Sequence, residues 1–376
     1  MTKNLSAMKA AQGIHGMAAL VGFAPKNLAY IVYGVKDEFK YTEFSISKKS
    51  GGSRTISSPI PKLKHVQARL AEHLTKCLHE IEIAEKVKPS CTLSHGFKPR
   101  LSIAKNAKNH VGRRWVLNVD LADFFPSINF GRVRGFFIKN KYFLMDHATA
   151  TLLAQIICHN NSLPQGAPTS PVVSNLIASN LDISLNRLAK RHRCTYTRYV
   201  DDLTFSTSRQ AFSNEIGFPT ADFNGIWMAG DELRYRIQRC GFALNPVKTR
   251  MQLRWSRQDV TGLVVNEKVN IPREYVKNVR AKCEHLISGK QPFHKKSKGT
   301  GAPNIAISVS QLQGMLAHIL RIKGAELDYK RPKDWNAAPS YLASHRRFLD
   351  YLNFASQQNP TILGTSEKPA TFGIIC

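Results

Sequence analysis

The chain has 376 residues, of which 43% are hydrophobic, so it can form one multi-lobed enzyme or two to three subdomains with a sizeable core. Its 54 Lys and Arg against 26 Asp and Glu give a net charge of +28, which predicts a polyanionic partner and disfavours an enzyme of small metabolites. No apolar run approaches the roughly 18 residues that span a bilayer, so nucleic acid is favoured over membrane.

Cysteine usage and the N-terminus indicate the compartment. The seven cysteines show no Cys-x-x-Cys spacing, which predicts reduced core thiols rather than a zinc site or disulfides. The N-terminus carries no apolar segment followed by a small-residue cleavage site. Both observations predict a cytoplasmic protein.

The first part of the chain predicts helices followed by a basic hairpin. Apolar positions within residues 1–37 recur at helical spacing, and Tyr41 to Ser47 alternates like a strand. Gly51 and Gly52 permit a hairpin turn after that strand. A long helix is expected after Pro61, with an apolar face formed by Leu63, Val66, Leu70 and Leu74. The basic residues around the hairpin tip are Lys48, Lys49 and Arg54.

Carboxylates mark the ends of two predicted strands in the central region. Trp115 to Leu121 predicts a mostly buried strand, and Asp120 lies where that strand ends. Asp201 and Asp202 lie at a tight turn between two strand-like runs, which predicts a β-hairpin. An Asp-Asp turn alone is often only solvated, but three carboxylates at strand ends suit Mg²⁺ or Mn²⁺.

The remaining segments continue this alternation of helix and strand. A helix is expected from Ser170, a second near Glu232 to Gln238, and strand-like alternation from Met251 to Val265. From Lys268 to Lys330, twelve Lys and Arg against four Asp and Glu accompany two amphipathic helical patterns. Residues 331–376 form an appendage whose role the sequence leaves open.

Five motifs resemble those of a known enzyme family. The segments 120–125, 163–171 and 199–202 resemble, in order and spacing, the three catalytic motifs in the polymerase palm of reverse transcriptases. Residues 106–110 match the Asn-Ala-x-x-His element, and residues 260–262 the Val-Thr-Gly element, of retron reverse transcriptases.

This resemblance, which runs from about Leu28 to about Gly324, implies the fold. It implies an α+β right-hand polymerase with fingers, a palm of antiparallel sheet with helices, and a helical thumb. The expected boundaries are 1–37 for an N-terminal helical cap of the fingers, 38–114 for the fingers, 115–267 for the palm with a fingers insertion around 127–170, 268–330 for the basic helical thumb, and 331–376 for a C-terminal appendage.

The resemblance also implies roles for individual residues. Asp120, Asp201 and Asp202 would be catalytic, and the Leu121 carbonyl would help them hold two Mg²⁺ ions, with Mn²⁺ as an alternative. Phe125 would exclude the ribose 2′-hydroxyl or would be an ordinary core residue, and Lys248 would be a general acid or a surface lysine. The full set expected to bind nucleotide is Lys48, Lys49, Arg54, Phe125, Gln165 and Lys248.

The retron-type elements imply RNA recognition. Asn106 and His110, four residues apart, would present an amide and an imidazole to RNA, although His110 is equally interpreted as a structural histidine. Thr261 and Gly262, with Val260, would approach ribose or phosphate, or would only mark a strand bulge. Lysines of the thumb loop would meet phosphates, namely Lys295, Lys296 and Lys298.

The resemblance therefore implies a retron reverse transcriptase that copies part of its own structured noncoding RNA into single-stranded DNA. Its expected partners are that RNA, the DNA product, deoxynucleoside triphosphates and an effector protein of an antiphage system, and no membrane. A branched RNA–DNA product is also implied. The alternatives are a group II intron-like or diversity-generating reverse transcriptase, or a non-catalytic RNA-binding scaffold, against which the three carboxylates argue.

Overall fold

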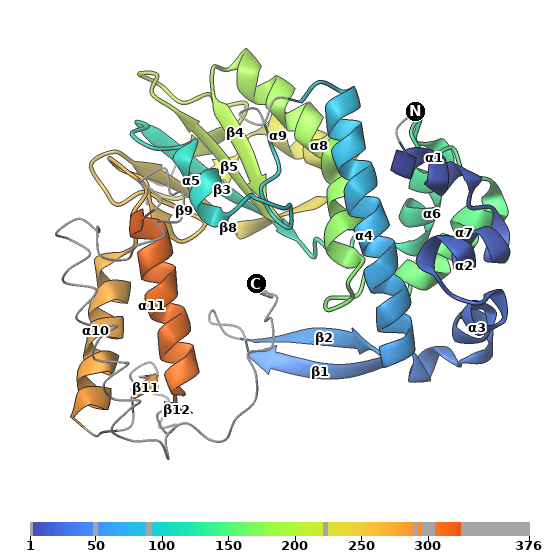
Figure 1. Ribbon diagram of the computed structural model, residues 1–376. Coiled ribbons are helices and arrows are strands. Elements are labelled where there is room, and N and C mark those ends of the chain that lie inside the picture. The colour runs from blue at the N-terminus through green and yellow to red at the C-terminus, as the bar shows by residue number, and fades with distance from the viewer. Residues whose placement is uncertain are drawn as a thin grey trace. The chain divides into compact units, whose positions relative to one another are not determined.

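The computed structural model describes residues 3–47, 52–87, 92–220, 225–288, 290, 292–294 and 305–324 (Figure 1). The chain divides into two compact units. The first comprises Met1–Thr261 and Val265–Glu267, and the second comprises Gly262–Val264 and Lys268–Cys376.

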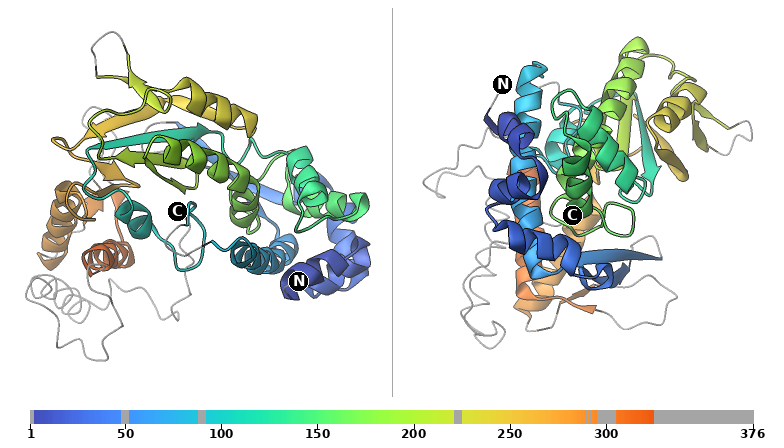
Figure 2. Two further views of the ribbon diagram at one scale, coloured as in Figure 1. Left: turned by 90° about the horizontal axis from the view of Figure 1, so that it is seen from above. Right: turned by 90° about the vertical axis from the view of Figure 1, so that its right-hand side faces the viewer.

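Short helices open the first unit. They are α1 (Lys3–Ala10), α2 (Gly13–Val21), α3 (Pro25–Ala29), a π-helical turn (Tyr30–Gly34) and a 3-10 turn (Asp37–Phe39). In Figure 2 the dark blue helices α1 to α3 stack along the long helix α4 (Pro61–Ala84). Pro61 suits the first turn of α4, where no backbone N–H is needed. The apolar face predicted for α4 is confirmed, because its members are buried: Leu63, Val66, Leu70 and Leu74.

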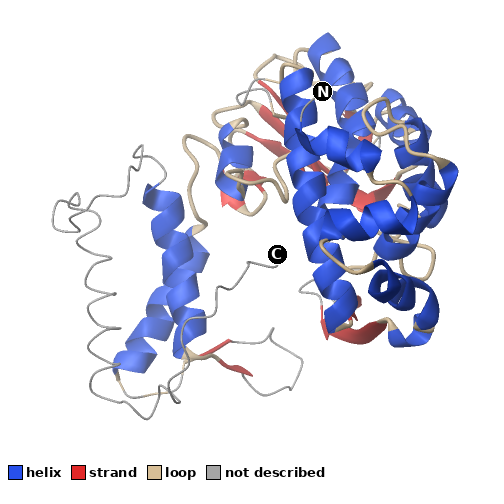
Figure 3. Ribbon diagram, turned by 45° about the vertical axis from the view of Figure 1, so that its right-hand side comes forward, coloured by secondary structure: helices blue, strands red, loops and turns tan. Residues whose placement is uncertain are grey.

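A two-stranded hairpin precedes α4 in the chain. Strands β1 (Tyr41–Ser47) and β2 (Ser53–Pro59) pair antiparallel over their whole length, as the sequence predicts (Figure 3). Arg54 lies on β2 opposite Ile46 and is exposed. Lys48 and Lys49 lie outside the described residues.

An antiparallel sheet of four strands carries the carboxylates. Its strands lie in the order β4 (Thr195–Tyr199), β5 (Asp202–Thr207), β3 (Trp115–Ala122) and β8 (Ala243–Leu253). β3 has a neighbour on each side, which agrees with its nearly continuous apolar run. The strand expected from Met251 begins instead at Ala243, because an edge strand with a bulge accommodates Pro246.

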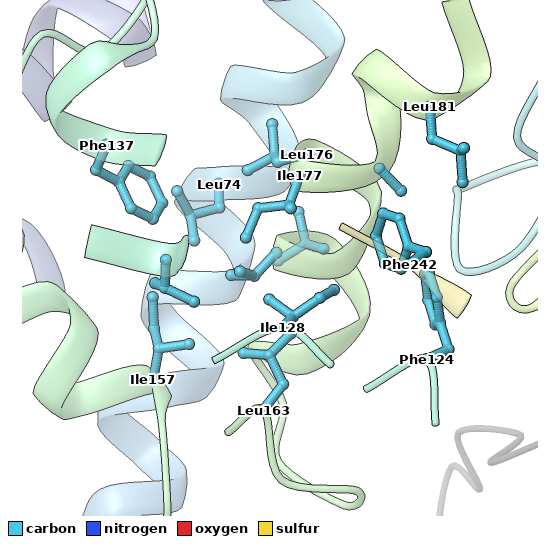
Figure 4. Close-up of a cluster of buried hydrophobic side chains, with 14 of the residues drawn as sticks. Leu74, Phe124, Ile128, Phe137, Ile157, Leu163, Leu176, Ile177, Leu181 and Phe242 are labelled. Atoms are coloured by element: carbon cyan, nitrogen blue, oxygen red, sulfur yellow. The ribbon is translucent and has the colours of Figure 1, made fainter. Parts of the chain in front are cut away.

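Helices pack around this sheet. The long helix α8 (Ser170–Arg191) contacts both β4 and α4. Phe124 and Phe242 stack at 5.5 Å in the apolar cluster of Figure 4, to which α4 adds Leu74 and α8 adds Leu176. Burial of these side chains is the main stabilising contribution to the unit. The other elements are α5 (Ile103–Lys108), α6 (Phe130–Lys139), α7 (His147–Ile157), β6 (Gly217–Pro219), β7 (Trp227–Ala229), α9 (Asp231–Arg239) and β9 (Asp259–Val260).

The second unit is mainly helical in its described part. Helices α10 (Arg273–Ile287) and α11 (Val309–Gly324) pack together and bury Val279, Leu312 and Leu316. The short strands are β10 (Leu263–Val264), β11 (Phe293–His294) and β12 (Ile305–Ala306), of which the last two pair antiparallel. The predicted basic loop with Lys295, Lys296 and Lys298, and the appendage 331–376, lie outside the described residues. None of the described helices combines the length and apolar character needed to cross a bilayer.

Candidate active site

Three carboxylates meet at one end of the four-stranded sheet. β4 and β5 form the predicted hairpin, and its turn places Asp201 immediately before Asp202, the first residue of β5. Asp202 is the antiparallel partner of Asp120 on β3, so the two side chains leave the same face of the sheet. The Leu121 N–H also donates to the Asp201 carbonyl at 3.1 Å. The local pairing thus brings together the acids that the sequence separates.

The carboxylates disfavour one another's charge. Burial, followed by the negative charge of Asp120, raises the pKa of Asp201. Loss of solvation, followed by the charges of Asp201 and Asp120, raises the pKa of Asp202 to about 7. Asp202 still reaches solvent, so screening reduces the associated free-energy cost. A cation bound between these carboxylates would reduce the repulsion among their negative charges.

Lys248 contacts the first of these acids. Its Nζ lies 2.9 Å from Oδ2 of Asp120, and this hydrogen bond raises the lysine pKa. The contact depends on a bulge in β8, where the pairing with β3 shifts between Asn118, opposite Arg250, and Asp120, opposite Asn245. Sequence reasoning left open a surface lysine, and Lys248 is half exposed but directed to the carboxylates.

The donor set suits a hard divalent cation whose coordination the substrate completes. Among the described residues, no three acidic, histidine or cysteine side chains already form a closed metal cage. Mg²⁺ is usually held by one or two carboxylates together with substrate phosphates and water. Asp120, Asp201 and Asp202 offer only oxygen ligands of this kind, and Leu121, whose carbonyl is the further expected ligand, is bonded to Asp201 through its N–H.

The β1–β2 hairpin is fastened to the loop that precedes α8. The Ser57 N–H on β2 donates to the Gln165 carbonyl at 2.8 Å. Gly166, at φ 120°, lies so close to β2 that an added Cβ would be 2.9 Å from Cγ2 of Ile56. Arg54 lies on the same strand, and its positive charge opposes the rise in the Asp201 pKa. Arg54 therefore lies within electrostatic reach of the carboxylates, and Gln165 is bonded to the strand that carries Arg54.

Phe125 differs from its neighbour Phe124. Phe124 is buried and stacks on Phe242. Phe125 is only partly buried and contacts the rings of Phe97, at 6.2 Å between centroids, and of Phe124, at 5.5 Å. Phe125 thus packs against the core with one face, and both alternatives for this residue, steric selection and core packing, stay predictions.

The expectation that Asn106 and His110 present their side chains to RNA is wrong, because neither has any exposed surface. The imidazole of His110 makes hydrogen bonds of 2.7 Å with the hydroxyls of Ser206 on β5 and Thr197 on β4. Burial lowers the pKa of His110 to about 3, so the ring is neutral. The structural interpretation of His110, which the sequence left open, is correct.

The Val-Thr-Gly element is divided between core and surface. Val260 has no exposed surface, so it is also wrongly expected to contact RNA. Thr261 and Gly262 both have positive φ, 49° and 79°, and this turn leaves Gly262 exposed. The Thr261 hydroxyl donates to the carbonyl of Ile103 at 3.4 Å, which joins the element to α5. The two retron-type elements are thus neighbours in space.

Sequence reasoning missed the groups beneath the Asp201–Asp202 turn. Arg198 is fully buried and forms an ion pair of 2.7 Å with Asp182 on α8. Gly96 packs directly against Val200 in the turn. The available signal was a charged residue on the buried face of a strand, together with an acid on the apolar face of a helix, since such charges are paired when buried.

Comparison with known proteins identifies the family. The model of the family "Reverse transcriptase (RNA-dependent DNA polymerase)" matches residues 46–271, so the chain belongs to the reverse transcriptases and is an RNA-directed DNA polymerase of right-hand fold. Enzymes of this family generally use divalent metal ions and an RNA template.

Its relatives narrow the assignment to the retron reverse transcriptases. The chain is 34% identical over 313 residues to the retron Ec86 reverse transcriptase of Escherichia coli, covering 82% of this chain and 89% of that enzyme. It is 32% identical over 331 residues to the retron Mx162 reverse transcriptase of Myxococcus xanthus, covering 81% of this chain and 62% of that enzyme. The match to a solved structure of telomerase from Candida albicans covers 88% of this chain and 66% of the telomerase chain, at a TM-score of 0.43 and 11% sequence identity.

Proposed function

We propose that this reverse transcriptase acts in the cytoplasm and copies part of its own structured noncoding RNA into single-stranded DNA, leaving a branched RNA–DNA product. We further propose an antiphage role together with an effector protein. The observation that carries the catalytic part is the meeting of Asp120 and Asp202 on paired strands, with Asp201 in the adjoining turn. Membership of the retron family supports the choice of template.

In the proposed reaction, Asp120 and Asp201 would hold two Mg²⁺ ions, assisted by Asp202 and the Leu121 carbonyl. Such ions would supply activation of the attacking 3′-hydroxyl and neutralisation of the charge on the leaving phosphate oxygens. Lys248 would give a proton to the departing pyrophosphate, and its contact with Asp120 supports this proposal.

Other residues bind and select the incoming deoxynucleoside triphosphate. Arg54, with Lys48 or Lys49, meets its phosphates, because a guanidinium binds phosphate oxygens in pairs. Gln165, fastened to β2 through its carbonyl, lines the pocket. Phe125 blocks a ribose 2′-hydroxyl with its accessible face.

The remaining regions are assigned by the same reasoning. We assign the helical cap to 1–37, the fingers to 38–114, the palm to 115–267 with a fingers insertion around 127–170, the thumb to 268–330 and an appendage to 331–376. Lys295, Lys296 and Lys298 in the thumb contribute charge that binds any RNA backbone. Thr261 and Gly262 remain the candidates of their element for a specific RNA contact, since they keep exposed or half-exposed surface.

Replacement of the paired acids tests the catalytic assignment. The variant D201N/D202N should lose primer extension while it folds and still binds RNA, because only the metal-binding charge is removed. D231N, at the exposed start of α9, is the matched control and should extend primers normally. Extension by D201N/D202N at the wild-type rate would refute the assignment of these carboxylates, whereas a wild type that binds RNA but extends no primer would leave RNA binding as the function.

Nucleic acid copurified with the protein tests the choice of template. Sequencing should return one structured RNA encoded beside the gene, joined to complementary DNA. Intron RNA or a mutagenised protein-coding repeat would instead indicate a group II intron-like or diversity-generating enzyme.

A further inference from the structure

The turn that carries Asp201 has a conformation that its sequence disfavours. Val200, the residue between Tyr199 and Asp201, has φ 61°. A β-branched residue is strained in this left-handed region and stays there only when its surroundings hold it. The position of the Asp201 carboxylate therefore depends on contacts that lie outside the turn.

Arg198 provides one such contact from below. Its side chain has no exposed surface, and its Nη1 donates to the Val200 carbonyl at 2.9 Å. Its Nε and Nη2 donate to both carboxylate oxygens of Asp182, at 2.8 and 2.7 Å, and Nη2 also reaches Oδ1 of Asn175 at 3.2 Å. Asp182 and Asn175 both belong to α8, so the planar guanidinium joins the turn to that helix.

A second contact holds the turn from the side. An added Cβ on Gly96 would be 2.8 Å from both the nitrogen and Cγ2 of Val200, so the segment around Gly96 leaves no space beside the turn. The Gly96 carbonyl accepts a hydrogen bond of 2.9 Å from Nδ2 of Asn175, and Ser94 Oγ donates to Oδ1 of the same residue at 2.8 Å. Asn175 thus connects this segment to the group that holds Arg198.

We propose that Arg198 is a positioning residue for DNA synthesis: held by Asp182 and Asn175, it fixes the Val200 peptide and so sets the Asp201 carboxylate against Asp120. The inference rests on the proposed role of Asp201 as a metal ligand. The next carbonyl, of Asp201, accepts from the Leu121 N–H and is anchored to β3, so a shift of the Val200 peptide on the other side of the Asp201 Cα reorients the acid relative to β3. A displacement of about 1 Å at a reacting centre typically costs about 100-fold in rate.

Two single substitutions separate positioning from general stability. R198K keeps the charge opposite Asp182, but one ammonium cannot also reproduce the bond to the Val200 carbonyl. Y196F is the matched control, because the Tyr196 hydroxyl donates to the same Asp182 oxygen at 2.9 Å and is also buried, yet makes no bond to the turn. If R198K does not fold, the uncharged pair D182N/R198Q takes its place, because it leaves no lone buried charge.

The readouts are kcat, the KM for deoxynucleotide and the half-saturating Mg²⁺ concentration, on an annealed primer-template. For R198K we expect kcat to fall by about 10- to 100-fold. We also expect a higher Mg²⁺ requirement and a nearly unchanged affinity for primer-template. Y196F should lower the melting temperature and leave all three kinetic quantities unchanged.

Wild-type kcat and Mg²⁺ requirement in folded R198K or D182N/R198Q would overturn the inference, and so would equal kinetic losses in R198K and Y196F. Measurement of D201N in parallel keeps the two claims apart. If the wild type is active and D201N is inactive, an unaffected R198K refutes only the positioning role. If D201N is active, the metal-site assignment itself fails.

Discussion

His110 predicts a measurable pH dependence of stability. Its pKa is about 3 in the folded chain because the ring is completely buried, against an ordinary value of 6.5. A histidine with a lowered folded pKa contributes stability that is complete above 6.5 and is lost as the pH falls, because the unfolded chain then binds a proton that the folded chain refuses. Protonation would also disrupt the hydrogen bonds with Ser206 and Thr197.

The magnitude follows from linkage. Between pH 7.5 and 5.0 the unfolded histidine gains most of a proton while the folded one gains almost none, which corresponds to about 2 kcal/mol of lost stability. H110Q removes this titration, so the free energy of unfolding should change with pH by about 2 kcal/mol less than in the wild type. At pH 7.5 the variant should be less stable by about 1–3 kcal/mol, because a buried hydroxyl loses its partner.

Urea denaturation at the two pH values, followed by circular dichroism, measures both effects. H79Q is the matched control, since His79 lies exposed on α4, and it should behave like the wild type. Burial also lowers the pKa of His95, to about 4, so H110Q should keep part of the wild-type pH dependence. If H110Q changed with pH as much as the wild type, His110 would be protonated in the folded chain, and direct contact with RNA would be restored as its role.

Three further predictions concern the active site. In steady-state incorporation assays, F125A should raise the ratio of kcat/KM for ribonucleotide over deoxynucleotide by about 10-fold or more. The control F124A should mainly lower the melting temperature. An unchanged ratio in F125A would make Phe125 a packing residue. G96A should lower kcat in primer extension, because its Cβ would displace Val200, and normal extension would show that the turn tolerates that shift. In thermal melts, Mg²⁺ should raise the melting temperature of the wild type more at pH 8 than at pH 6, because the Asp202 carboxyl, with a pKa of about 7, loses its proton between these values. Equal stabilisation at both pH values would contradict the raised pKa of Asp202.

The sequence predicted the features that depend on local chemistry. The β1–β2 hairpin, the start of α4 and the β4–β5 turn follow from period-two alternation, proline at a helix start and Asp in a tight turn. These signals act within a few residues, so no tertiary information was needed. The strand ends that carry Asp120 and Asp202 were predictable in the same way, whereas their approach depends on the pairing of β3 with β5 and was expected from the order and spacing of the motifs.

The features that sequence failed to predict depend on partners far away in the chain. His110 bonds to side chains 87 and 96 positions away, and nothing in the local motif distinguishes a buried imidazole from one offered to RNA. The bulge that turns Lys248 towards Asp120 arises from the pairing of β8 with β3. The local sequence around Pro246 carries no signal for this bulge. Tertiary packing decided these cases against the local pattern.

The net charge of the chain and the charge of its active site act in opposite directions on a polyanionic ligand. A net charge of +28 attracts a polyanion, but the Asp120, Asp201 and Asp202 carboxylates repel the same phosphates; burial, followed by their mutual proximity, raises the pKa of Asp201 and Asp202. Divalent cations remove this conflict because the phosphates complete their coordination. Nucleotide binding at the carboxylates should therefore require metal, whereas binding of RNA to the basic surface should need none and should weaken with salt.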